Sequence, residues 1–132
     1  MGVLVDYFAA SGAELEGADL SAGPAAIGWP YVDCKGWLDG LAALAAELTG
    51  RDASEFGEDI PITDDDPEAE SMLARVRPEV AQALAGVTDD RLARYAGDEL
   101  LDDEESERNV QLRDLARSAV AGGRDVYCWS SL

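Results

Sequence analysis

Hydrophobic and polar positions alternate over several short stretches of the chain, which is the pattern of β-strands. Residues 3–8 predict a first strand with one well-buried face and a second face that is at least partly covered. Residues 31–34 follow a Trp-Pro pair, which imposes an extended backbone, and predict a second strand. Residues 126–129 predict a closing strand, and residues 71–77 fit either a strand or a helical turn.

Elsewhere, apolar residues recur at spacings of three and four, which predicts amphipathic helices. The clearest stripe precedes Gly50, a residue suited to a left-handed helix end. This stripe consists of Leu38, Leu41, Leu44, Ala45 and Leu48. Shorter helices are predicted within residues 11–17, 79–85 and 88–97, where capping residues and glycines mark the ends. A long helix ends near Ala121, and its predicted buried stripe is Leu112, Leu115, Ala116, Ala119 and Val120.

Residues 51–70 have no sustained period and contain two prolines, so we expect a long acidic surface loop there. Taken in chain order, the elements predict an α+β fold. We expect one domain over residues 1–132, with a small mixed sheet of about four strands covered by helices. Both terminal segments belong to this predicted sheet, whereas the order of its strands does not follow from these patterns.

The charge balance is strongly acidic. Ten Lys and Arg residues stand against 28 Asp and Glu residues, which gives a net charge of −18. Such a surface opposes approach to phosphate backbones and anionic lipid and favours encounter with basic proteins, although acidity also serves solubility alone. We therefore expect neither direct nucleic-acid binding nor membrane association. The N-terminus lacks the pattern of a secretion signal, which favours a cytoplasmic protein.

Few side chains suit catalysis. Histidine is absent, which removes the commonest general base and the usual metal ligand, and we expect no cofactor and no metal. Cys34 is followed by Lys35, whose charge would favour a reactive thiolate, and Trp37 lies close by as a pocket wall. Because neighbouring strand residues point to opposite faces, a buried structural thiol is the favoured interpretation. Cys34, Lys35 and Trp37 are nevertheless the candidate residues of a ligand pocket.

Two acidic clusters are candidate surfaces for a basic partner. They comprise Asp64, Asp65 and Asp66 in the predicted loop, and Asp102, Asp103, Glu104 and Glu105 near the start of the last helix. Both clusters also have structural explanations, because loop carboxylates are solvated and carboxylates at a helix start are favoured by the helix dipole. The loop acids do not match a calcium-binding EF-hand, because the sixth position from Asp64 is Ala69 rather than glycine.

One stretch of the chain carries a characteristic set of core residues. These residues are Val32-Asp33, Lys35, Trp37, Leu41, Leu44 and Leu48-Thr49-Gly50. A helix, a turn at Gly122-Gly123 and a closing strand follow near the C-terminus. This arrangement resembles the YfbM-like family of uncharacterised bacterial proteins. The resemblance implies an α+β fold and no established activity, so it assigns no catalytic residues.

The functional hypothesis that these patterns favour is a non-enzymatic acidic protein that binds a basic partner protein. In its sharpest form it is an immunity-type inhibitor that covers the cationic active site of a nuclease-like toxin. The alternatives are a small enzyme or ligand-binding protein with a pocket near Cys34, and a nucleic-acid mimic whose carboxylates imitate a phosphate array. A homodimer formed through exposed aromatic residues is also compatible with the sequence.

Overall fold

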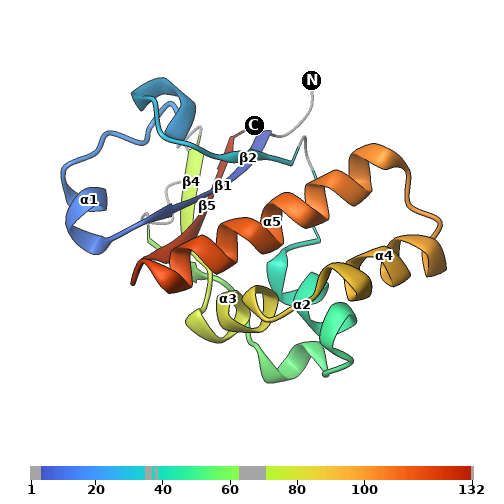
Figure 1. Cartoon of the computed structure of the whole chain (residues 1–132). Helices are drawn as coiled ribbons and strands as arrows, with labels where there is room; N and C mark the ends of the chain where they lie inside the picture. The colour runs from blue at the N-terminus through green and yellow to red at the C-terminus, as the bar shows by residue number, and fades with distance from the viewer. Residues whose placement is uncertain (1–3, 35–36, 38, 63–70, 132) are drawn as a thin grey trace.

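A five-stranded antiparallel sheet forms the centre of the computed structural model, which describes residues 4–34, 37, 39–62 and 71–131 (Figure 1). The strands are β1 (Leu4–Ala10), β2 (Val32–Asp33), β3 (Ile60–Pro61), β4 (Ser71–Arg75) and β5 (Asp125–Ser131). Their order in the sheet is β2-β1-β5-β4-β3. The helices are α1 (Gly12–Glu16), α2 (Leu41–Thr49), α3 (Pro78–Ala85), α4 (Asp89–Asp98) and α5 (Asp103–Ala121). Two short 3₁₀ turns, η1 (Pro24–Ile27) and η2 (Ala53–Glu55), complete the elements of the described residues.

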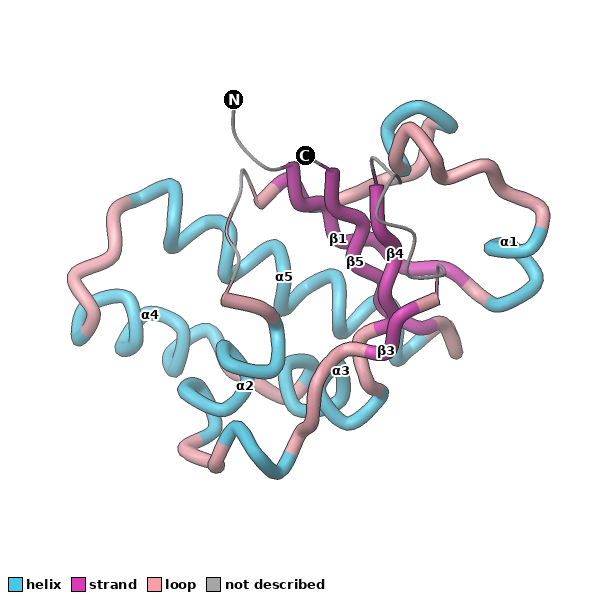
Figure 2. Tube along the Cα trace, turned by 180° about the vertical axis from the view of Figure 1, so that it is seen from behind, coloured by secondary structure: helices cyan, strands magenta, loops and turns pink. Residues whose placement is uncertain are grey.

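The predicted α+β fold is confirmed, with differences in the sheet. The described sheet has five strands where about four were expected, and every pairing is antiparallel where a mixed sheet was expected. The additional strand is β3, which lies beside β4 within the predicted loop (Figure 2). Two residues, one of them a proline, are too short to produce a hydrophobic period, which is why sequence patterns did not reveal β3.

The two terminal strands pair along their whole length at the middle of the sheet. The pairing runs from Leu4 opposite Ser131 to Ala10 opposite Asp125. Both faces of β1 are buried because both faces of the sheet are covered. Val5 and Tyr7 face the helical layer, whereas Phe8 packs on the other side.

The helical layer is dominated by α5, which crosses the sheet with α2, α3 and α4 beside it (Figure 1). Leu112, Ala116 and Ala119 are buried as predicted. Val120, however, is exposed, and Arg113 is buried in addition to the apolar stripe. Arg113 is buried because of a tertiary contact: its Nη1 donates to the carbonyl of Val87, which follows α3, at 2.8 Å.

The opposite face of the sheet is covered by residues 11–31, which include α1 and η1 (Figure 1). Leu20 and Trp29 from this segment pack with Phe8 and Trp129 of the sheet. Gly23 lies so close that a Cβ there would stand 3.0 Å from the Trp129 ring, and its φ is +90°. Glycine therefore allows the segment to lie directly on the indole.

Several element boundaries differ from the sequence prediction. Residues 71–75 form a strand rather than a helical turn, and α4 continues through Gly97 to Asp98. Helix α2 begins at Leu41, and Leu38 of its predicted stripe lies outside the described residues. No helix among the described residues is both long enough and apolar enough to span a bilayer.

Candidate functional site

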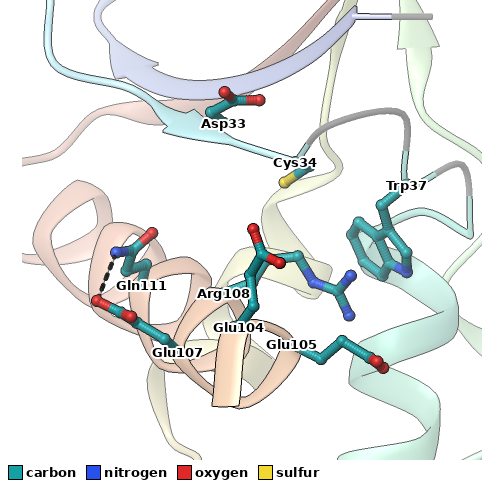
Figure 3. Close-up of a pocket in the computed structure, with 8 residues that line it drawn as sticks. All are labelled: Asp33, Cys34, Trp37, Glu104, Glu105, Glu107, Arg108 and Gln111. Carbon is teal, nitrogen blue, oxygen red and sulfur yellow. Dashed lines mark hydrogen bonds between the residues drawn. The ribbon is translucent and has the colours of Figure 1, made fainter. Parts of the chain in front are cut away.

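Two adjoining hollows meet at the N-terminal half of α5, the first beside Cys34 and Trp37 and the second beside α2 and α4. Their volumes are about 480 Å³ and about 450 Å³, and they share Trp37, Glu105 and Arg108. The first is also lined by Asp33, Cys34, Glu104, Glu107 and Gln111 (Figure 3). The second is also lined by Asp39, Ala43, Leu44, Glu47, Tyr95 and Leu101. We call the two hollows together the acidic groove.

One face of α5 supplies most of the wall of the first hollow. Glu104, Arg108 and Gln111 follow a spacing of four and three residues, which places them on the same side of a helix. Glu107 borders this face and accepts a 3.5 Å hydrogen bond from the Gln111 amide (Figure 3). The helix start is fixed by Asp102, whose Oδ1 accepts the backbone N–H of Glu105 at 2.8 Å. A capped, long helix thus presents these side chains from a rigid element.

Arg108 lies at the junction of the two hollows. Its guanidinium carbon stands 4.5 Å from the centre of the Trp37 ring (Figure 3). The indole is held in turn by Tyr7, with ring centres 6.4 Å apart, and by Asp39, which accepts its N–H at 3.1 Å. Among the described residues, the buried Nε of Arg108 has no hydrogen-bond partner, and Nη2 donates one long hydrogen bond, of 3.4 Å, to Asn109 Oδ1. Arg108 is therefore held mainly by stacking, and it forms no ion pair with a described carboxylate of the groove.

The second hollow is bounded by α2 and α4, which are joined by polar contacts. Arg91 donates from Nε to the Leu48 carbonyl at 2.9 Å and from Nη2 to the Glu47 carbonyl at 3.1 Å. These bonds satisfy carbonyls at the end of α2 that have no partner within the helix. The Tyr95 hydroxyl donates to the Glu47 carboxylate across the hollow.

Cys34 lies in the wall of the first hollow and is buried. Burial raises the pKa of its thiol to about 12, and the nearby charge of Arg108 opposes this rise only in part. The thiol is therefore protonated at neutral pH, and a protonated thiol is a poor nucleophile. Lys35, the neighbour predicted to activate it, lies outside the described residues.

The structure brings together residues from two separate predictions. Cys34 and Trp37, the predicted pocket residues, line the same hollow as Glu104 and Glu105 of the predicted partner surface. Asp102 caps α5, and Asp103 is exposed in its first turn. The loop carboxylates of Asp64, Asp65 and Asp66 lie outside the described residues.

Other lining residues were not anticipated, namely Asp33, Arg108 and Gln111 of the first hollow. The helical spacing of Arg108 and Gln111 from Glu104 is a readable signal that these side chains share one face. That this face meets Trp37 depends on tertiary packing.

The described residues offer no metal centre, since no group of three or more carboxylate, thiol or imidazole side chains lies close enough to hold an ion. The chemical character of the groove is instead that of carboxylates around an aromatic floor, with a single described cation at its middle.

Compared with known proteins, the chain matches no family model, no curated protein and no solved structure, so its resemblance to the YfbM-like family stays a prediction.

Proposed function

We propose that this protein is a non-enzymatic binding protein whose acidic groove and adjoining α5 start dock a basic partner protein. The observation that supports it most directly is the composition of the groove. Six carboxylates line the two hollows, whereas Arg108 is the one cation among the described lining residues. The carboxylates belong to Asp33, Asp39, Glu47, Glu104, Glu105 and Glu107.

The net charge of the whole protein, −18, has the same sign as this local imbalance. A surface of one sign steers a partner of the opposite sign, raises the association rate and makes that rate dependent on salt. The aromatic floor formed by Trp37 provides apolar area, which gives a docked segment more than charge pairing alone. In its most specific form, the proposal is an immunity-type inhibitor that covers the cationic active site of a nuclease-like toxin.

The experiment is an affinity capture from lysate of the native host, with this protein as bait and elution by a salt gradient. The bait is compared with a neutralised variant that combines Asp102→Asn, Asp103→Asn, Glu104→Gln and Glu105→Gln. Asparagine caps helices about as well as aspartate, so α5 keeps its start in this variant. We expect a basic protein that is retained at low salt by the wild type and lost by the neutralised variant.

The matched control changes four exposed carboxylates outside the groove by Glu16→Gln, Glu58→Gln, Glu79→Gln and Asp90→Asn. Because this control loses the same number of charges as the neutralised variant, it distinguishes the effect of the charges at the groove from the effect of the overall charge. Retention of the partner by the control and not by the neutralised variant supports docking at the start of α5 and at the groove wall that Glu104 and Glu105 form. Equal binding by all three proteins, or no basic protein retained at low salt, would contradict the proposal.

A second candidate function is the binding of a small molecule in the first hollow. Its volume of about 480 Å³ falls within the range of small-molecule sites. The indole of Trp37 would report an occupant through its fluorescence, so a screen of cationic metabolites with Trp37→Phe as the control tests this function. An unchanged emission spectrum throughout the screen would count against it.

A further inference from the structure

The turn between α4 and α5 presents an unusual leucine to solvent. The side chain of Leu100 is 90 % exposed, compared with 60 % for Met72, the next most exposed of the large apolar residues described. An isolated exposed apolar residue is ordinary on protein surfaces. Leu100 is distinguished by its backbone and by its surroundings.

Leu100 has a φ of +54°, and it is the one described residue other than glycine with a positive φ. The turn has the hydrogen bonds of a Schellman motif, from Leu100 N–H to the Gly97 carbonyl at 3.4 Å and from Leu101 N–H to the Ala96 carbonyl at 2.9 Å. Leu100 occupies the left-handed position of this motif, where glycine is preferred because a Cβ is strained there. Stability alone would thus favour glycine at this position, on account of both the backbone and the exposure.

The surroundings of Leu100 are acidic. Asp98, Glu99, Asp102 and Asp103 flank it in the chain, all four are exposed, and none forms an ion pair with a described cation. Leu101, the next residue, lines the second hollow of the acidic groove. The turn therefore joins the groove to a protruding apolar side chain within a field of negative charge.

We propose that Leu100 is the apolar anchor of the partner interface and enters an apolar pocket or stripe on the partner that is bordered by Lys and Arg. This inference rests on the proposed function and specifies the partner's surface. Charge complementarity selects a basic protein over a second copy of this chain, because self-association would bring two acidic turns together. An apolar core within a polar, solvent-accessible rim is the common arrangement of a protein–protein interface.

The test uses two synthetic peptides with the same number of lysines. One forms an amphipathic helix with a leucine face and a lysine face, and in the other serine replaces every leucine. Binding of each peptide is measured by titration calorimetry at low salt to the wild type, to Leu100→Gly, and to the neutralised variant defined above. Val120→Ala, which shortens an exposed apolar side chain at the other end of α5, is the matched control.

We expect Leu100→Gly to lower the affinity for the Lys/Leu peptide by about ten- to a hundredfold, because the free energy gained by burying one leucine is lost. Its affinity for the Lys/Ser peptide and its thermal midpoint should not fall, because glycine relieves the backbone. The neutralised variant should bind both peptides more weakly, and Val120→Ala should bind like the wild type.

Unchanged affinity of Leu100→Gly for the Lys/Leu peptide, with both peptides still bound by the wild type, would overturn the anchor and leave the proposed function standing. Failure of the wild type to bind either peptide would overturn the proposed function and the anchor together. A concentration-dependent dimer in sedimentation that disappears in Leu100→Gly would replace the basic partner by a second copy.

Discussion

Asp6 is a buried carboxylate in β1, an inner strand of the sheet that lies between β2 and β5. Its side chain is 8 % exposed, and it lies opposite Asp33 of β2 and Trp129 of β5. Burial, and secondarily the charge of Asp33, raise the pKa of Asp6 to about 6 from its usual value of 3.8. The native state therefore binds a proton here more readily than the unfolded chain does.

Asp6→Asn should stabilise the protein at neutral pH, by an amount on the order of 2 kcal/mol, because it removes a charge that is disfavoured by burial. With a folded pKa above the unfolded value, the contribution of Asp6 to stability is present at low pH and is lost as the pH rises through about 6. The gain from the substitution should thus shrink as the pH falls from about 6 towards 4. Urea unfolding of both proteins across this range measures the difference, with exposed Asp90→Asn as the control. An advantage of Asp6→Asn that is the same at every pH would contradict the assigned pKa.

The two cysteines provide a second test at this scale. Burial raises the pKa of Cys34 to about 12 and that of Cys128 to about 11. We expect both thiols to react with a disulfide reagent at neutral pH at least about a hundredfold more slowly in the native protein than after unfolding. Cys128→Ser isolates the signal of Cys34. Rapid native labelling of that variant would restore Cys34 as a candidate nucleophile.

At the scale of elements, arginine side chains and helix caps fix the helices that frame the groove. Arg117 donates from Nε to the Ala85 carbonyl at 3.0 Å and from Nη2 to the Val87 carbonyl at 3.1 Å, at the end of α3. Asp102 serves the other end of α5 as its N-cap. Asp102 is thus both a helix cap and a member of the acidic surface. Substitutions that keep or remove the cap while removing the charge can separate these two roles.

Asp102→Ala should lower the free energy of unfolding by about 1 kcal/mol through loss of the cap, whereas Asp102→Asn should leave it nearly unchanged. Both substitutions remove the same charge, so both should slow association with a basic partner to a similar extent. Thermal unfolding and stopped-flow association measure the two effects. Equal stability of the two variants would show that the cap contributes nothing to α5.

At the scale of the whole molecule, the net charge of −18 acts on the folded protein itself. The described ion pairs involve few of the acidic residues, so much of the repulsion among carboxylates is not compensated. A compact state that concentrates charge of one sign is destabilised by this repulsion.

Raising the ionic strength from about 0.01 M to about 0.5 M should therefore raise the midpoint of thermal unfolding, since the screening length falls well below the size of the protein. The neutralised variant should respond less, because it carries four fewer negative charges. Calorimetry in sodium chloride measures both. A midpoint that falls with salt would indicate that attractive ion pairs outweigh the repulsion.

Much of the fold was predictable from signals that span a few residues. The Ser11–Glu14 capping box, the Thr88 cap and the left-handed Gly50 lie where sequence patterns indicated helix ends. Strand β1 carries apolar residues on both faces, as expected for a covered strand. The two residues of β3 were missed because their strand character comes only from pairing with β4.

The candidate site was predictable only in part. Cys34, Trp37, Glu104 and Glu105 were singled out as residues, but as members of two separate hypotheses. The role of Arg108 was missed, because its contact with Trp37 joins segments that are far apart in the chain. Sequence periodicity gives the face of a helix on which a side chain lies, but does not give what that face meets.

The sequence by itself determined the charge, the absence of histidine, the helix ends and the α+β class, because these depend on composition and on interactions within about one helical turn. Only the tertiary structure decided the strand order, the burial of Asp6 and Arg113, and the meeting of α5 with Trp37. Those features depend on which distant segments pack together, and that choice is made by the summed burial of the whole core rather than by any local pattern.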